Sequence, residues 1–232
     1  MLEIDKLPFL APVLDTLPRT IKVRGFAAEP RFVVRMPFLG QEFDTDYYAR
    51  GQAEHKKLAS YGVNVPEIRL VRTTAGIMTI VDRIHGQQLM DATDISDAKL
   101  NAFYRGLAGY FRDKNRDRTT FLADLRFDQF MYGHRIGEGE ENVYLVDVDP
   151  FIAHCTYPVP SRALISPVRT FGVMLKVGLE HFPAADLSDS IKAYEDLVNS
   201  LEGLSPHDRD FLDVGILSGR SRRQLLASGR GN

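Results

Sequence analysis

Hydrophobic and polar positions along the first third of the chain predict two β-hairpins with a helix between them. TIKVRGFAAEPRFVVRM (residues 20–36) contains two β-rich runs around a Gly-Ala-Ala-Glu-Pro turn. EIRLVRTTAGIMTIVDRI (67–84) repeats this pattern, with Thr-Ala-Gly at its turn. DTDYYARGQAEHKKLASYG (44–62) predicts the helix, because Asp and Thr favour its start and Gly62 is suited to its end.

The middle of the chain carries its strongest helical period. Apolar residues recur at i, i+3, i+4, i+7, i+8 and i+11 on one face, and Ser96 stands where an N-cap is wanted. These residues are Leu100, Phe103, Tyr104, Leu107, Ala108 and Phe111. A Gly/Glu-rich turn (133–142) and an apolar run, VYLVDVDPF (143–151), follow further on. From about Val168 the pattern is helical again.

The order of these elements predicts the fold class. Strands, one helix and more strands precede a mostly helical half, and this segregation is typical of α+β proteins rather than of alternating βαβ units. We expect two lobes: a β-rich N-lobe with one main helix at residues 1–84, and a helical C-lobe at 85–232. The boundary between them should fall near Ile84 to Met90.

Composition narrows the class of protein. A chain of 232 residues can bury one large core or two small ones. A net charge of −2 gives no general field for nucleic acid or an anionic membrane, and no run approaches the ~18 apolar residues of a membrane span. The N-terminus lacks a signal-peptide pattern, and the single cysteine, Cys155, favours a reducing compartment. We therefore expect a cytoplasmic protein.

The stretch FLADLRFDQFMYG (121–133) places two aspartates and an arginine among apolar residues after the strong helix. The run YLVDVD then brings Asp147, 23 positions after Asp124. This arrangement resembles the protein-kinase-like superfamily, in which a loop Asp-Leu-x-x-x-Asn follows a long helix and a later strand ends in a metal-binding Asp. The resemblance is to its small atypical members: lipopolysaccharide-core sugar kinases, aminoglycoside/choline-kinase-like enzymes and RIO-type kinases.

The resemblance implies roles for five residues in phosphoryl transfer. Asp124 matches the carboxylate that orients the acceptor hydroxyl, and Arg126 would neutralise charge on the transferred group. Asp147 would hold Mg²⁺ on ATP, together with the amide oxygen of Gln129, which stands where the family has Asn. Asp149 completes an Asp-Val-Asp ending and is a second metal candidate.

Further matches concern nucleotide binding. Arg35 stands on a strand where the family has its phosphate-binding Lys, and Glu54 matches the helix acid that pairs with that cation. Backbone groups of Asp82 to Ile84 would hydrogen-bond adenine at the segment that connects the lobes. The implied activity is ATP- and Mg²⁺-dependent transfer of a phosphoryl group to a hydroxyl. The acceptor, whether a sugar, a small molecule or a protein, leaves no signature in the sequence.

Several departures from the family keep a second function open. No loop with spaced glycines precedes the Arg35 strand, Arg replaces Lys there, and Leu122 stands where the family has His or Tyr. Gln129 is one methylene longer than Asn. The alternative is a catalytically weak or inactive pseudokinase that serves a protein partner as a binding or regulatory module.

Simpler interpretations also remain for the single residues. Asp124 could end a strand in solvent, Glu54 could be a helix-surface acid and Arg35 an edge-strand cation. Gln129 could equally be a turn residue, and Asp149 could cap a turn before the proline that follows it.

Overall fold

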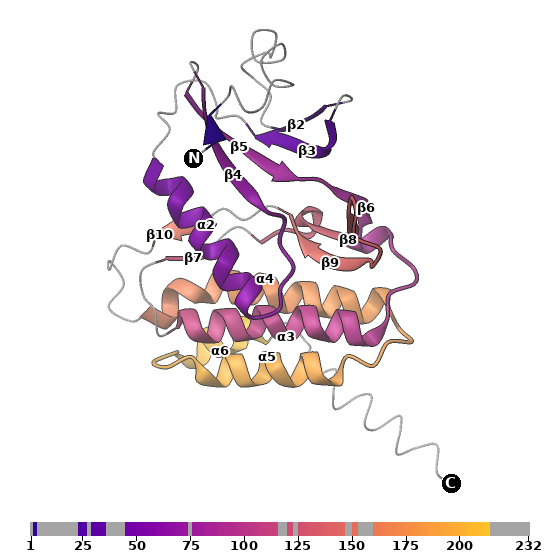
Figure 1. The fold of residues 1–232 in the computed structure, drawn as a ribbon. Coiled ribbons are helices and arrows are strands. Elements are labelled where there is room, and N and C mark those ends of the chain that lie inside the picture. Colours follow the sequence, from indigo (N-terminus) through magenta and orange to yellow (C-terminus); the bar gives the residue numbers. More distant parts are fainter. Residues whose placement is uncertain are drawn as a thin grey trace.

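The computed structural model shows an α+β protein in which sheets occupy one end and helices the other (Figure 1). Three of the described helices lie in the second half of the chain, as the sequence pattern predicts. The residues that the structure describes are 2–3, 23–26, 29–35, 45–73, 76–115, 120–122, 125–146, 150–152 and 160–213.

A five-stranded sheet contains both predicted hairpins. The first hairpin pairs β2 with β3 and has a register shift between Gly25 and Phe26, and the second pairs β4 with β5. Antiparallel pairing of β3 with β5 joins the two hairpins into one sheet. In spatial order the strands are β1 (Leu2–Glu3), β4 (Ile68–Thr73), β5 (Gly76–Asp82), β3 (Glu29–Arg35) and β2 (Val23–Phe26).

The helix α2 (Thr45–Ser60) connects the two hairpins, as predicted, and runs from the level of the sheet to the helical layer (Figure 1). Gly62 follows its end with φ +78°, a left-handed conformation that glycine adopts without strain. The chain turns there and enters β4.

A three-stranded antiparallel sheet, β6-β8-β9, lies next to the helical layer. Its first strand was expected to be a connecting segment between lobes, but it pairs along its length with β8. Gly86 and Gly133 stand opposite each other in this pair, and a Cβ on either would overlap the backbone of the other strand. The two glycines therefore permit this close approach. The strands are β6 (Ile84–Gln88), β8 (Phe130–Arg135) and β9 (Asn142–Leu145).

The helical layer contains α3, α4, α5 and α6, stacked below the sheets in Figure 1. Ser96 caps α3 as predicted: its hydroxyl accepts a hydrogen bond from the N–H of Lys99 at 3.4 Å. Helix α4 begins earlier than the expected start near Val168 and includes Pro167 in its interior. The helices are α3 (Asp97–Lys114), α4 (Pro160–His181), α5 (Ser188–Ser200) and α6 (Pro206–Leu212).

The core lies between α3 and its neighbours, because the whole predicted apolar face of α3 is buried. Edge-to-face aromatic contacts extend this core into the three-stranded sheet: the rings of Phe103 and Phe130 have centroids 5.1 Å apart. On the other side Phe171 of α4 contacts Tyr194 of α5 at 5.5 Å. The three-stranded sheet is thus fixed to the helices.

Candidate functional site

A cavity of about 460 Å³ lies between the five-stranded sheet and the three-stranded sheet. We call it the cleft. Four residues predicted as site residues line it together: Asp82 and Ile84 from one side, and Arg126 and Gln129 from the other. The sequence places these pairs more than forty residues apart, and the fold brings them to one cavity.

The cleft has aliphatic walls that sequence reasoning missed. Val33 of β3 and Val81 of β5 are direct cross-strand partners in the five-stranded sheet. Met131 of β8 and Val146, which follows β9, come from the second sheet. Apolar walls with a few polar groups are typical of small-molecule sites. A signal was present in the sequence, because each of these four residues stands one or two positions from a predicted site residue: Arg35, Asp82, Gln129 or Asp147.

The backbone at Asp82 and Arg83 is already engaged within the protein. The N–H of Asp82 donates to the carbonyl of Glu67 at 3.0 Å, and the N–H of Arg83 donates to the carbonyl of Arg31 at 2.7 Å. Adenine recognition was predicted to use backbone groups of Asp82 to Ile84. Two of the N–H donors in this segment are therefore already hydrogen-bonded within the protein, and these bonds tie the segment to the five-stranded sheet.

The side chain of Asp82 faces cations at the edge of the cleft. Its carboxylate lies 3.6 Å from the guanidinium of Arg69 and 4.0 Å from Nε of Arg135. Burial raises the pKa of Asp82 above its ordinary value, although both arginines act to lower it. Desolvation therefore outweighs the attraction of the cations at this position.

Gln129 closes the loop that enters the cleft. Its side chain is buried, and its Oε1 accepts a hydrogen bond from the N–H of Arg126 at 3.0 Å. The backbone N–H of Gln129 donates to the carbonyl of Arg126 at 3.1 Å. Among the described residues its Nε2 has no hydrogen-bond partner. The amide oxygen predicted to bind metal thus already serves a backbone donor, with one lone pair remaining.

The side chain of Arg126 is 55% exposed and extends toward solvent at the cleft. It pairs with Asp128 at 3.5 Å, and the carboxylate of Asp128 is similarly exposed. Exposed ion pairs of this kind contribute little to stability. The Arg126–Asp128 pair is therefore a weak, solvent-facing contact at the cleft.

The three predicted carboxylates, Asp124, Asp147 and Asp149, lie outside the described residues. The chain on either side of them is described. The N–H of Val146 donates to the carbonyl of Gln129 at 2.8 Å.

The strands that flank these segments pair with each other. Leu122, the last residue of β7 (Thr120–Leu122), is the register partner of Pro150, the first residue of β10 (Pro150–Ile152). The segment from Leu122 to Gln129 and the segment from Val146 to Pro150 therefore begin and end at the same two pairs of residues. We call these two pairs the flanking pairs.

Glu54 has different partners from the one predicted. Its carboxylate accepts hydrogen bonds from Nζ of Lys114 at 2.8 Å and from the hydroxyl of Tyr110 at 2.7 Å, and all three side chains are buried. The predicted partner, Arg35, pairs through its backbone with Val23 and Thr79 in the sheet, and its side chain lies outside what the structure describes. Lys114 was missed, although it and Tyr110 are spaced i, i+4 on α3.

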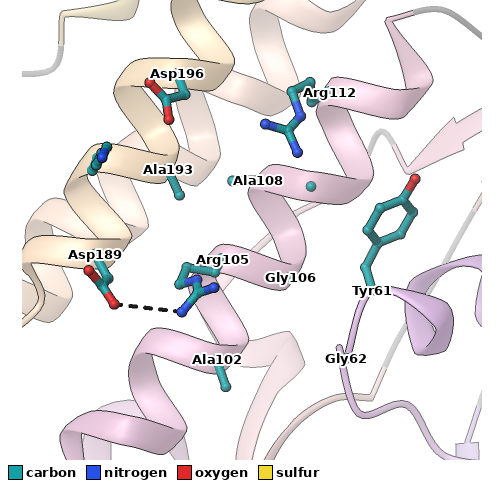
Figure 2. Close-up of a pocket in the computed structure, with 12 residues that line it drawn as sticks. Tyr61, Gly62, Ala102, Arg105, Gly106, Ala108, Arg112, Asp189, Ala193 and Asp196 are labelled. Atoms are coloured by element: carbon teal, nitrogen blue, oxygen red, sulfur yellow. Dashed lines mark ion pairs between the residues drawn. The ribbon is translucent and has the colours of Figure 1, made fainter.

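A second groove, of about 670 Å³, lies between α3, α5 and the turn after α2 (Figure 2). Across it the side chains of Arg105 and Asp189 point toward each other and form an ion pair at 3.6 Å. Both side chains are more than half exposed, and cations and acids line the groove together. None of the predicted site residues lines it. The cleft is therefore the candidate site.

No family model and no curated protein matches the chain. Among the described residues, no cluster of His, Cys, Asp or Glu side chains is arranged to hold a metal ion. No helix within the described ranges combines the length and apolar character of a membrane-spanning segment.

Proposed function

We propose that the protein transfers a phosphoryl group from Mg²⁺-bound ATP to a hydroxyl acceptor, and that it has a two-lobe, kinase-like fold. One observation carries the proposal: a single cleft is lined by the segment Asp82–Gly86, by three residues of the loop (Arg126, Asp128 and Gln129) and by Val146, the residue before Asp147. The order of the elements also supports it: the β2–β3 hairpin, α2, the β4–β5 hairpin and α3 precede the loop Arg126–Gln129, as the resemblance implies.

The aliphatic walls of the cleft suit the base of a nucleotide. Val33 and Val81 supply apolar surface from one sheet, and Met131 and Val146 supply it from the other. Contact with such side chains removes the faces of a purine ring from water, and this lowers the free energy of the complex. Polar groups at the edge of the cleft would then fix the orientation of the base.

The flanking pairs support a phosphate site at the end of the cleft. Leu122 with Pro150 and Gln129 with Val146 bracket the segments that carry Asp124 and Asp147. Because the two segments are joined at both of their ends, their carboxylates can serve one reaction. In the proposal, Asp124 accepts a hydrogen bond from the acceptor hydroxyl and takes its proton.

The chain offers hard oxygen ligands of the type that Mg²⁺ prefers. Asp147 and Asp149 would hold the ion, and the remaining lone pair of the Gln129 amide oxygen is available to it. Bound Mg²⁺ neutralises charge on the phosphates and orients them for transfer. Arg126 would exchange its exposed ion pair with Asp128 for the transferred group, and Arg35 would contact the phosphates from β3.

The alternative is a pseudokinase that binds a protein partner, and two observations favour it. Two backbone donors expected to recognise adenine are used within the protein, at Asp82 and Arg83. Glu54 bonds to Lys114 and Tyr110. Such a protein would keep the kinase-like fold but would lack the arrangement of side chains that phosphoryl transfer requires.

A thermal-shift titration with ATP, with and without magnesium, tests the proposal. We expect magnesium-dependent stabilisation that is lost in Asp147→Ala and kept in Asp210→Ala, a control at an exposed residue of α6. ATP turnover should be abolished in Asp124→Ala while nucleotide affinity changes little. Stabilisation without turnover would favour the pseudokinase. No shift with any nucleotide would overturn the proposal.

A further inference from the structure

Three buried side chains connect α2, α3 and β7, and the proposed chemistry does not use them. Nζ of Lys114 lies 2.8 Å from Oε1 of Glu54, and the hydroxyl of Tyr110 donates to Oε2 of the same carboxylate at 2.7 Å. The Tyr110 hydroxyl also accepts a hydrogen bond from the backbone N–H of Leu122 at 2.7 Å. A continuous chain of hydrogen bonds thus runs from Lys114 to the end of β7.

The direction of each bond in this chain is determined. Because the Tyr110 proton is directed to the Glu54 carboxylate, a lone pair of the hydroxyl is left to face the N–H of Leu122. Lys114 in turn holds the other oxygen of Glu54 and fixes the plane of the carboxylate. The Tyr110 hydroxyl is therefore oriented as an acceptor for one specific backbone group.

That backbone group stands two residues before Asp124 in the sequence. Leu122 is the last residue of β7 and pairs with Pro150, the residue after Asp149. The other end of the loop is held independently, by the bond from Val146 to Gln129. Release of Leu122 would therefore free the end of the loop nearest to Asp124 and leave the Gln129 end in place.

We propose that Tyr110 is a positioning residue, oriented by Glu54 and Lys114, that fixes the Asp124 end of the catalytic loop through the N–H of Leu122. Its catalytic consequence rests on the proposed phosphotransfer. A misplaced Asp124 would lower the rate of transfer without weakening nucleotide binding, because the aliphatic walls of the cleft lie elsewhere. Tyr110 itself contacts no reacting group in this proposal.

Tyr110→Phe in the full-length protein tests the inference. We expect amide hydrogen exchange at Leu122 to accelerate by about tenfold or more, since its acceptor is removed. We expect kcat to fall by about 10- to 100-fold with no change in affinity for Mg·ATP. Tyr194→Phe is the matched control, because it removes another buried hydroxyl that bonds to a backbone group, the carbonyl of Leu212 at 2.8 Å. That control should leave exchange at Leu122 and kcat unchanged.

A second comparison tests whether the charged pair orients the hydroxyl. Lys114→Met should accelerate exchange at Leu122, whereas the double variant Glu54→Gln with Lys114→Met keeps an amide oxygen for Tyr110 and should restore slow exchange. It should also recover kcat by about tenfold over Lys114→Met alone.

Two results would overturn the inference: unchanged exchange at Leu122 in Tyr110→Phe, or faster exchange with wild-type kcat. Exchange is measured without substrate, so it tests the hydrogen-bonded chain by itself. A wild-type protein that never turns over ATP would therefore count against the proposed function, and exchange at Leu122 would still decide whether Tyr110 holds the loop.

Discussion

Glu54 of α2 and Lys114 of α3 form an ion pair across 60 positions of sequence, with side chains only 5% and 3% exposed. The pair fixes the helix that connects the two hairpins to the helical layer. Removing both charges from water is unfavourable, and their mutual attraction and the bond from Tyr110 offset this. Leaving either charge buried there without the other is strongly unfavourable.

Loss of one partner should therefore destabilise the fold strongly. We expect Lys114→Met to lower the free energy of unfolding by about 3 to 5 kcal/mol, and the double variant Glu54→Gln with Lys114→Met to lower it by much less. Lys57→Met is the control, because Lys57 and Asp113 join the same two helices through a more exposed ion pair. Its effect should stay below about 1 kcal/mol. Urea unfolding measures all three, and equal effects of the two single variants would contradict the prediction.

The Gly86–Gly133 pair should not tolerate a side chain. In Gly86→Ala the new Cβ would overlap the carbonyl oxygen of Tyr132, a backbone atom that cannot rotate away. We expect a loss of about 3 kcal/mol in unfolding free energy. Gly139→Ala is the control, since no atom lies within 4 Å of its added Cβ, and its effect should be about 0.5 kcal/mol or less. A Gly86→Ala protein as stable as the control would show that the strands can separate.

Asp82 and Glu67 should affect stability with opposite dependence on pH. Burial raises the pKa of Asp82, so the folded state binds its proton more tightly than the unfolded chain does. Its favourable contribution is present below the ordinary aspartate pKa, about 4, and is lost as pH rises through the raised value. The hydrogen bond from Arg69 lowers the pKa of Glu67, so its contribution is present at neutral pH and is lost on acidification.

Melting temperatures of two variants check these signs. Relative to the wild type, Asp82→Asn should become more stable as pH rises from about 4 to about 7, and Glu67→Gln should become less stable. Parallel curves for the two variants would show that desolvation does not dominate at Asp82.

Local patterns predicted most of the secondary structure. Both hairpins, α2 and α3 were predicted because alternation, helical period, capping and turn residues are local properties of the sequence. Strand β6 was missed because its pairing with β8 depends on residues almost fifty positions away. The early start of α4 was missed as well, since it contains Pro167 and the tertiary packing outweighs that proline.

The candidate site was predictable only in part. Register with a known motif pointed to Arg126 and Gln129, and the structure places both in the cleft beside Asp82 and Ile84. Bonding partners do not follow from register: Lys114 lies 60 residues from Glu54, and nothing local shows that their side chains meet. The same holds for the backbone donors at Asp82 and Arg83, whose acceptors lie on other strands.

The flanking pairs also have a consequence for the order in which the protein folds. Leu122 with Pro150 encloses Gln129 with Val146, which in turn encloses the β8–β9 hairpin, so the contacts are nested by sequence separation. The hairpin closes the shortest loop and loses the least chain entropy, and it should form first. Each outer pair then adds only a short loop to one already closed. The ends of the segments that carry the aspartates would thus come together only after the β8–β9 hairpin has formed, as pairing proceeds outward from the turn between β8 and β9.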